Sequence, residues 1–173
     1  MNDPTPPAGP AGPGTPPVID SRAGFLAALH WGLQTAVARG ARSILWSDPG
    51  FGDWPLDDAA WLAPLPAWLR RPKRRLTLLA ADYAEVPRRH PRFNGWRRDW
   101  AHAIDCWQPT PDLAGEVPTL LLDDTGVSVH LIDALHWRGR AALDEQTAAL
   151  WRERIDALLQ RSEPAFPVST LGL

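Results

Sequence analysis

The run Leu76-Thr77-Leu78-Leu79-Ala80, which ends before Asp82, decides the fold. A short, continuous apolar run is typical of a strand that is covered by helices on both faces. The stretch Ser43-Ile-Leu-Trp46 is also apolar and compatible with a strand, and the turn-rich sequence after it must end that strand. Two buried strands separated by a helical stretch predict an α/β layered domain.

Segments with apolar residues at helical spacing precede and follow these two strands in the sequence. Phe25, Leu29 and Leu33 recur with the period of a helix that Ser21 can cap and Gly40 can close. Residues 57–70 also carry a helical pattern, but two prolines within it predict two short helices in place of one. Residues 84–101 predict a helix that is interrupted at Pro91, and a last amphipathic helix follows Asp144.

The second half of the chain adds strands that have no helices between them. Residues 103–107 predict a third strand, and the segments 119–123 and 127–132 flank Asp124-Thr-Gly126, a hairpin signal. The expected order is therefore α-β-α-β-α-β-β-β-α, in a single α/β domain over residues 19–173 with a mixed, largely parallel sheet. Residues 1–18 contain seven prolines and three glycines, which predicts a flexible, disordered leader.

Composition narrows the class of protein. The chain has 173 residues, of which 45% are hydrophobic and 22% charged, the usual balance of a globular domain. No apolar run approaches the roughly 20 residues of a membrane-spanning helix, and the start of the chain lacks the features of a secretory signal. We therefore expect a soluble, cytoplasmic protein. Cys106 is the only cysteine, which excludes an internal disulfide and a cysteine-based metal site.

Charge is distributed very unevenly along the chain. The net charge is -2, yet residues 70–98 carry +8 and the remainder carries -10. In this segment arginines alternate with Phe93, Trp96 and Trp100, a mixture that binds phosphate groups and stacks on planar ligands. The favoured hypothesis is a non-catalytic domain that binds a protein partner or an anionic ligand through residues 88–100. The predicted ligand-binding residues are Arg92, Trp96, Arg97 and Arg98.

Nucleic acid is a less favoured partner in this reading. The sequence pI is about 6.2, whereas domains dedicated to nucleic acid often have a pI above about 9. The chain has 17 arginines and one lysine, so many of these arginines can be ordinary solvated positions. Most of the ten tryptophans fall on core-facing helical stripes, and only Trp46, Trp54 and Trp107 follow strands closely enough to line a pocket.

Aspartates at the strand ends offer an enzymatic alternative. Asp48 follows the first strand and Asp82 the second, where the carboxyl ends of parallel strands meet. Two such carboxylates could hold Mg²⁺ for a phosphoryl-transfer or phosphohydrolase reaction, with His102 as acid or base. The simpler reading is that these aspartates form turns and helix caps. No phosphate-binding loop, nucleophile elbow or paired-histidine metal motif is present in the sequence.

The hairpin and the order of elements resemble one half of the phospholipase D fold. In that family a strand carries H-x-K-x-x-x-x-D, and the aspartate opens a turn much as Asp123-Asp124-Thr-Gly does here. The resemblance extends over Ser43–Trp107 and into the helix after Asp144. The ending, from Leu150-Trp151 through Ser162-Glu-Pro to Leu171-Gly-Leu173, is similar to that of an uncharacterised bacterial phospholipase-D-like family.

The catalytic histidine and lysine of that family have no counterpart in this chain. With Asp124 as the motif aspartate their positions hold Val117 and Thr119, and with Asp123 they hold Glu116 and Pro118. His136-Trp-Arg138 followed by Asp144 also departs from the motif, in spacing and in its arginine. The resemblance therefore implies a degenerate, non-catalytic member that needs no cofactor. A third hypothesis is a homodimer formed through a Trp-rich surface.

Overall fold

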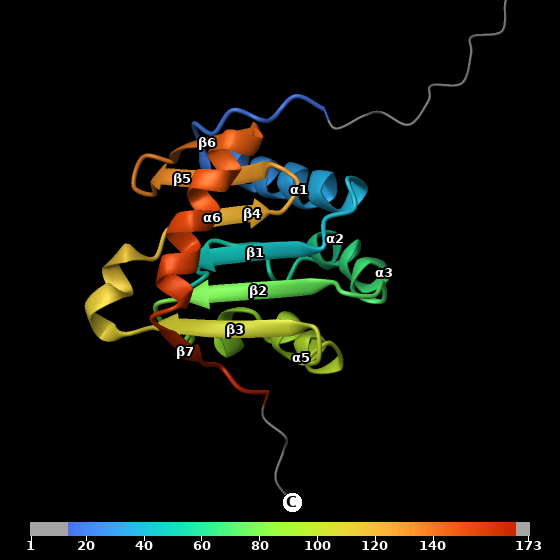
Figure 1. Cartoon of the computed structure of the whole chain (residues 1–173), viewed down its shortest axis with the longest axis vertical. Helices are drawn as coiled ribbons and strands as arrows, with labels where there is room; N and C mark the ends of the chain where they lie inside the picture. The colour runs from blue at the N-terminus through green and yellow to red at the C-terminus, as the bar shows by residue number, and fades with distance from the viewer. Residues whose placement is uncertain (1–13, 169–173) are drawn as a thin grey trace, which may run out of the picture.

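A computed structural model describes residues 14–168 of the chain. Its centre is a seven-stranded sheet with the order β6-β5-β4-β1-β2-β3-β7 (Figure 1). The strands are β1 (Ser43–Asp48), β2 (Arg75–Ala80), β3 (Ile104–Pro109), β4 (Thr119–Asp123), β5 (Val127–Asp133), β6 (Arg138–Leu143) and β7 (Ser162–Pro164). The helices are α1 (Arg22–Ala38), α2 (Ala59–Leu62), α3 (Leu65–Leu69), α4 (Val86–Arg89), α5 (Pro91–Asp99), η1 (Pro111–Glu116) and α6 (Glu145–Leu159).

The sheet is mixed, which confirms the predicted class, but it is mostly antiparallel. Strands β1, β2 and β3 are parallel neighbours, joined by the helical connections α2–α3 and α4–α5. The other four neighbouring pairs are antiparallel. The balance differs from the expected largely parallel sheet because the chain returns after β3 without a long crossover helix, and β4, β5 and β6 follow one another as hairpins on the far side of β1.

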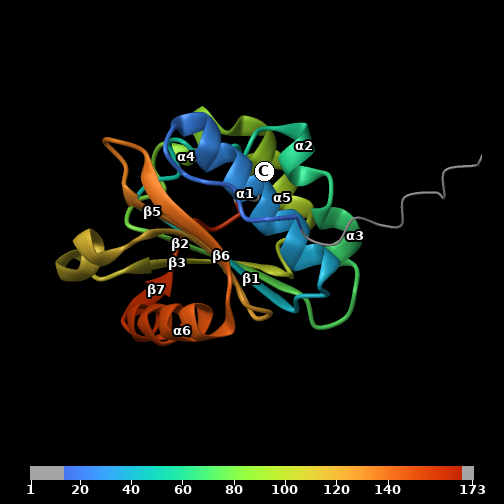
Figure 2. The same cartoon turned by 90° about the horizontal axis from the view of Figure 1, so that it is seen from above.

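Helices cover the two faces of the sheet unequally. Figure 2 shows α1 to α5 on one face and α6 alone on the other. Successive side chains of β1 point to opposite faces of the sheet. Ile44 and Trp46 pack in the larger core on the α1–α5 side, and Leu45 packs in the smaller core beneath α6. Both faces of β1 and β2 are therefore buried, as their continuous apolar runs predict.

Helix α1 forms as its sequence predicts and lies very close to the sheet. The side chain of Ser21 accepts a hydrogen bond from the N–H of Gly24, so the predicted cap is confirmed. A β-carbon added at Gly32 would lie 2.9 Å from a methyl group of Val129 and 3.1 Å from one of Leu121. A glycine is thus needed here, where the helix backbone approaches β4 and β5.

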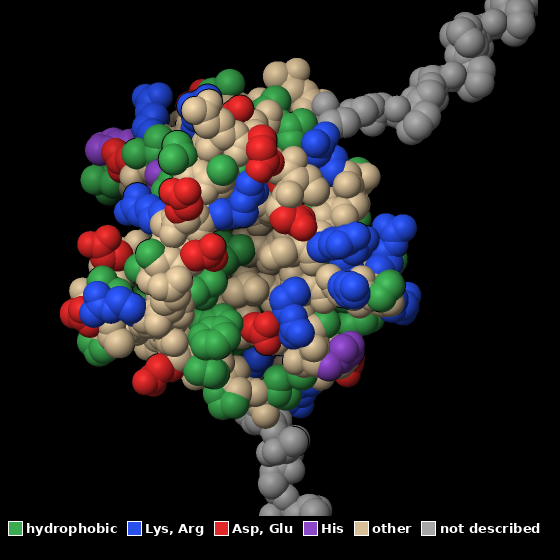
Figure 3. All heavy atoms as spheres, viewed as in Figure 1, with side chains coloured by type: hydrophobic (Ala, Val, Ile, Leu, Met, Phe, Trp, Pro, Cys, Tyr) green, Lys and Arg blue, Asp and Glu red, His purple; other side chains and the backbone are tan. Residues whose placement is uncertain are grey.

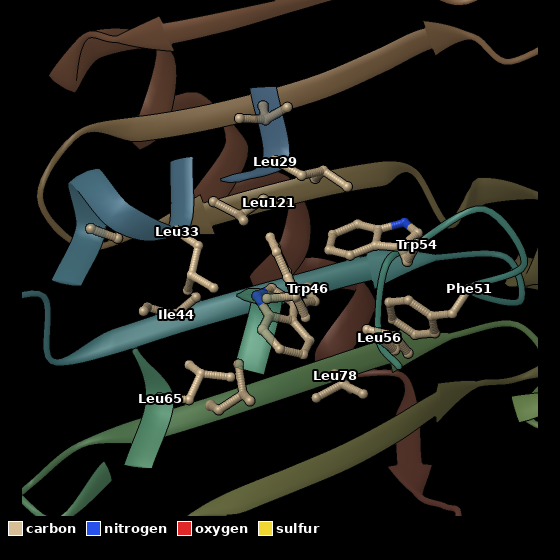
Figure 4. Close-up of a cluster of buried hydrophobic side chains, with 14 of the residues drawn as sticks. Leu29, Leu33, Ile44, Trp46, Phe51, Trp54, Leu56, Leu65, Leu78 and Leu121 are labelled. Carbon is tan, nitrogen blue, oxygen red and sulfur yellow. The ribbon is translucent and has the colours of Figure 1, made fainter. Parts of the chain in front are cut away.

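Aromatic side chains fill much of the larger core. Trp46, Trp54 and Trp61 pack together with ring centroids 5.1–6.1 Å apart, and Figure 4 shows Trp46 and Trp54 among the surrounding leucines. All three are at most 3% exposed. Their indole N–H groups have no hydrogen-bond partner among the described residues. Core packing, the first explanation for the many tryptophans, therefore holds for Trp61. It also accounts for Trp46 and Trp54, which were expected to lie where they could line a pocket.

The predicted breaks in the helical segments are confirmed. Residues 57–70 form the two short helices α2 and α3, and Pro64 caps the second of them. Residues 84–101 form α4 and α5, which meet at His90 and Pro91. Helix α6 begins where Asp144 caps it by accepting a hydrogen bond from the N–H of Thr147.

The structure adds strands β6 and β7 to the predicted order. Strand β6, Arg-Gly-Arg-Ala-Ala-Leu, has none of the β-branched or aromatic residues that mark strands, and it forms by pairing with β5. Strand β7 has three residues, includes Pro164 and pairs at the outer edge of β3, where a proline is tolerated.

Part of the predicted leader lies against the domain. Residues 1–13 lie outside the described residues, as do residues 169–173. The carbonyl of Gly14 accepts a hydrogen bond from the indole of Trp31 at 2.9 Å. Ile19, at the predicted start of the domain, forms a β-bridge with Gly139 of β6 and is 4% exposed.

Candidate functional site

Helix α5, which carries the predicted ligand-binding residues, crosses the face of the sheet from one end of the parallel strands to the other. Its first turn is fixed at the carboxyl end, where the N–H of Phe93 donates to Asp57 and the ring of His90 contacts the carbonyl of Phe51. Nine helical residues extend about 13 Å. Arg92 and Arg98 are both exposed and lie near opposite ends of this helix.

Arg97, another of the predicted ligand-binding residues, is buried and does not belong to an exposed surface. It is only 4% exposed. Phe93 and Arg97 are one helical turn apart, so both face the core.

Trp96 is half-buried between two other aromatic rings. Its ring stacks on Phe93 at 6.0 Å between centroids and lies 6.3 Å from the ring of Trp100. Trp96 and Trp100 both pack against the larger core, so each offers only part of its surface to a ligand.

A different group of basic residues gathers at the end where the parallel strands begin. Helix α3 ends at Leu69, and the chain turns through Pro72 before β2 starts at Arg75. Figure 3 shows Lys and Arg side chains gathered at this end of the molecule, beside α3 and the starts of β2 and β3. We call these five residues the basic cluster: Arg70, Arg71, Lys73, Arg74 and Arg75.

Few acidic groups neutralise the basic cluster. Among the described residues its one ion pair joins Arg75 to Asp105 at 3.3 Å. Arg70, Arg71 and Lys73 are exposed, and Arg74 is half-buried with its Nε unpaired among those residues. Among the described residues, positive charge therefore accumulates here with little acidic compensation.

The basic cluster also has an aromatic neighbour and a strained turn. The guanidinium of Arg70 lies 5.8 Å from the ring centre of Trp100, within the range of a cation–π contact. Lys73 has a φ of 59°, in the left-handed region that lysine seldom adopts. Such backbone strain persists where surrounding structure enforces it, often at binding sites.

Asp48 and Asp82 lie at the carboxyl end of the parallel strands, as predicted, but Asp48 is fully engaged in local structure. Its carboxylate accepts hydrogen bonds from the N–H groups of Gly50 and Phe51, at 3.0 and 2.5 Å, and from the hydroxyl of Thr119 at 2.6 Å. Asp82 accepts from the N–H of Ala84 at 2.8 Å. Both aspartates form turns, which is the simpler of their two readings.

His102 lies at the other end of the sheet from these aspartates. It precedes β3, and its carbonyl accepts a hydrogen bond from Arg75 at the start of β2. Six-residue parallel strands separate the two ends by about 20 Å. The three residues of the enzymatic alternative therefore do not converge. No group of three or more His, Cys, Asp or Glu side chains in residues 14–168 is arranged to hold a metal ion.

A hollow does exist at the carboxyl end, but Asp48 does not line it. It measures about 430 Å³ and is lined by Pro49, Gly50, Gly52, Asp53, Asp82, Glu85 and Arg89. Asp53 lies 3.8 Å from Arg22, and Asp58 caps α2. The loop acids thus have structural partners of their own.

The aspartates of the hairpin that carried the family resemblance also form turns. Asp123 is buried and accepts hydrogen bonds from the N–H groups of Thr125 and Val127, and its burial raises the pKa of its carboxyl. Asp124 accepts from the N–H groups of Arg42 and Ser43. These contacts join the hairpin to the start of β1, so both side chains are explained by the fold.

Comparison of the chain with protein-family models, with curated proteins and with solved structures finds no match. The phospholipase-D-like resemblance therefore stays a prediction. In residues 14–168 no helix has the length and apolar character needed to cross a membrane.

Proposed function

We propose that this protein is a binding domain for an anionic partner, and that the basic cluster is its contact surface. The observation that carries the proposal is the charge at this end: five basic side chains within six residues, with a single acidic partner among the described residues. Arginine binds phosphate and carboxylate groups in pairs of hydrogen bonds, and exposed charges of one sign attract a partner of the other.

The function is still the predicted one, the binding of an anionic partner, but the contact surface is the basic cluster in place of residues 88–100. The segment from Arg88 to Trp100 contributes Trp100 and Arg98 at one end, whereas Arg92 lies at the far end of α5. The pattern in the sequence that marks the new location is Arg70-Arg-Pro-Lys-Arg-Arg75, a basic run interrupted by a turn-forming proline.

The experiment compares two double variants that remove the same charge from opposite ends of the sheet. Arg71→Gln/Lys73→Gln neutralises part of the basic cluster, and Arg89→Gln/Arg92→Gln is the matched control. Binding of fluorescein-labelled oligothymidylate, heparin and poly-glutamate is measured by anisotropy over a range of NaCl concentrations.

We expect at least one of these polyanions to bind with an affinity that falls with salt. For the single-stranded oligonucleotide, each lost contact should lower the slope of log K against log salt by about 0.7. The basic-cluster variant should therefore lose roughly 1.4 in slope, and the control should keep the wild-type slope. Flat titrations with all three probes, or equal losses in the two variants, would show the proposal to be wrong.

A further inference from the structure

A second site is indicated by the surroundings of Arg97, which is buried and has no anionic partner among residues 14–168. No Asp or Glu oxygen of the described residues lies within 4 Å of its guanidinium, which takes part in none of the ion pairs there. A buried, unpaired charge is costly, and proteins ordinarily neutralise it with a partner.

The hydrogen bonds of Arg97 are also few and weak. One terminal nitrogen lies 3.7 Å from the sulfur of Cys106, and the other lies 3.5 Å from the carbonyl of Pro167. The Nε has no partner among the described residues. A guanidinium offers five N–H donors, and thiols are weak acceptors, so most of its capacity is unused.

Neighbouring groups do not supply the missing negative charge. Burial raises the pKa of the Cys106 thiol to about 11, so this thiol is neutral at physiological pH. Burial likewise raises the pKa of Tyr83, whose hydroxyl donates to backbone carbonyls. Asp105, the nearby carboxylate on β3, pairs with Arg75.

The position of the guanidinium is fixed by aromatic packing. It lies 3.9 Å from the ring centre of Phe166. The ring of Tyr83 stacks on Phe166 with centroids 5.0 Å apart. The chain following β7 is tied to β3 by a 2.9 Å hydrogen bond from the N–H of Ala165 to the carbonyl of Cys106. Arg97 is thus held in place without being neutralised.

A cavity of about 240 Å³ lies beside this arginine. Its walls include Arg97, Ala101, Ile104 and Trp107, together with the segment from Pro164 to Val168. Pockets for drug-sized ligands measure roughly 300 to 1,000 Å³, so this one fits a smaller molecule. Its walls are polar and apolar in similar measure, and their charged residues are Arg97 and Asp105.

We propose that this cavity binds a small carboxylate with an apolar body, whose carboxylate group is held by Arg97. The planar guanidinium matches a carboxylate in geometry and charge, and the bound anion would supply the partner that the arginine lacks. The apolar part of the walls would receive the remainder of the molecule. The site shares no residue with the basic cluster, so each of the two proposals can fail without the other.

The experiment titrates the full chain with butyrate, benzoate and inorganic phosphate at constant ionic strength. Binding is followed by the melting temperature and by the protection of Cys106 from a thiol reagent. Arg97→Met removes the charge and keeps most of the volume, Ala101→Leu narrows the cavity with Arg97 intact, and Arg98→Met is the matched control on the exposed side of α5.

We expect a saturable rise in melting temperature with butyrate or benzoate and a slower reaction of Cys106. Arg97→Met should weaken binding about tenfold or more, since a charge-assisted hydrogen bond contributes about 1.5–3 kcal/mol. Ala101→Leu should also weaken binding, and Arg98→Met should leave it unchanged.

Three results would overturn the proposal. They are no saturable effect on the wild type, equal binding by wild type and Arg97→Met, and binding of phosphate without either carboxylate. If Arg97→Met does not fold, Ala101→Leu decides, because unchanged carboxylate affinity in that variant would contradict the cavity as the site.

Discussion

Asp48 illustrates how a side chain placed where ligands bind can be fully used by the fold. Its position after β1 is the place at which an α/β sheet binds ligands, yet its two oxygens accept three protein hydrogen bonds. The two backbone donors turn the chain after β1, and the hydroxyl of Thr119 connects that turn to β4.

We predict that Asp48→Ala lowers the free energy of unfolding by about 1–3 kcal/mol, because buried donors lose their acceptor. The loss should be the same with and without Mg²⁺ in urea denaturation. Asp53→Ala, at an exposed ion pair in the same loop, should change stability by less than about 0.5 kcal/mol. A stabilisation by Mg²⁺ that Asp48→Asn abolishes would instead support the enzymatic alternative.

At the residue level, the sequence predicts which residues cap helices, but it does not predict which charged side chains are buried. Ser21, Asp58 and Asp144 cap helices through contacts within three residues, so their roles follow from local spacing. The burial of Arg97 depends on Phe166, which is far away in the chain. No local pattern encodes a contact of that kind.

At the scale of the elements, the backbones of strands β5 and β6 come very close to each other at Gly139, where no side chain is in the way. A β-carbon added at Gly139 would lie 2.4 Å from the carbonyl oxygen of His130, beside the irregularity in pairing between Leu131 and Asp133. Backbone atoms cannot yield as a flexible side chain can, so the two strands would have to separate.

We predict that Gly139→Ala destabilises the protein by about 1–3 kcal/mol, the usual cost of overpacking. Gly95→Ala is the matched control, because Gly95 lies in helix α5 with nothing within 4 Å of an added β-carbon. It should stabilise the protein by about 0.5–1 kcal/mol through better helix propensity. Thermal and urea denaturation measure both changes, and effects of the same sign would contradict this interpretation.

The elements that sequence patterns predict are those with an apolar pattern of their own, either a helical spacing or a short apolar run. Helices α1 and α6 and strands β1, β2, β4 and β5 all carry such patterns. Strands β6 and β7 carry none, because their pairing is imposed by β5 and β3. Their existence is a tertiary effect, which accounts for their absence from the predicted order.

For the molecule as a whole, the unequal layers imply unequal local stability. Helix α1 contributes five buried side chains to the larger core, whereas α6 contributes Ala148, Ile155 and Leu158 to the smaller one. Segments with few buried contacts open at a lower free energy than the whole protein does. The α6 layer is thus expected to open separately.

We predict that amides of α6 exchange through an opening that costs less free energy than global unfolding, while amides of α1 and β1 exchange only by global unfolding. Native-state hydrogen exchange at low denaturant concentrations measures both. Leu158→Ala should speed exchange mainly in α6, and Leu29→Ala should speed it throughout. Equal protection in both layers would contradict the prediction.

The sequence predicts the α/β class of the whole molecule, but it does not predict how many strand pairs are parallel and how many are antiparallel. Alternating strands and helices up to β3 indicate an α/β sheet, and the structure has one. The sequence does not show on which side of β1 the later hairpins lie, and this determines how many pairs are antiparallel. In the same way, the charge of the 70–98 segment is visible in the sequence, but its division between two ends of the sheet is not.

The cluster of Trp46, Trp54 and Trp61 gives the protein a distinct optical property. Indole rings held rigidly 5.1–6.1 Å apart give circular-dichroism bands that depend on their fixed packing. The native protein should show such a signal from these indoles, and it should be lost when the layer of α1 to α5 separates from the sheet. Trp107 and Trp151 pack against the smaller core, so part of the indole signal also reports on the α6 side of the sheet.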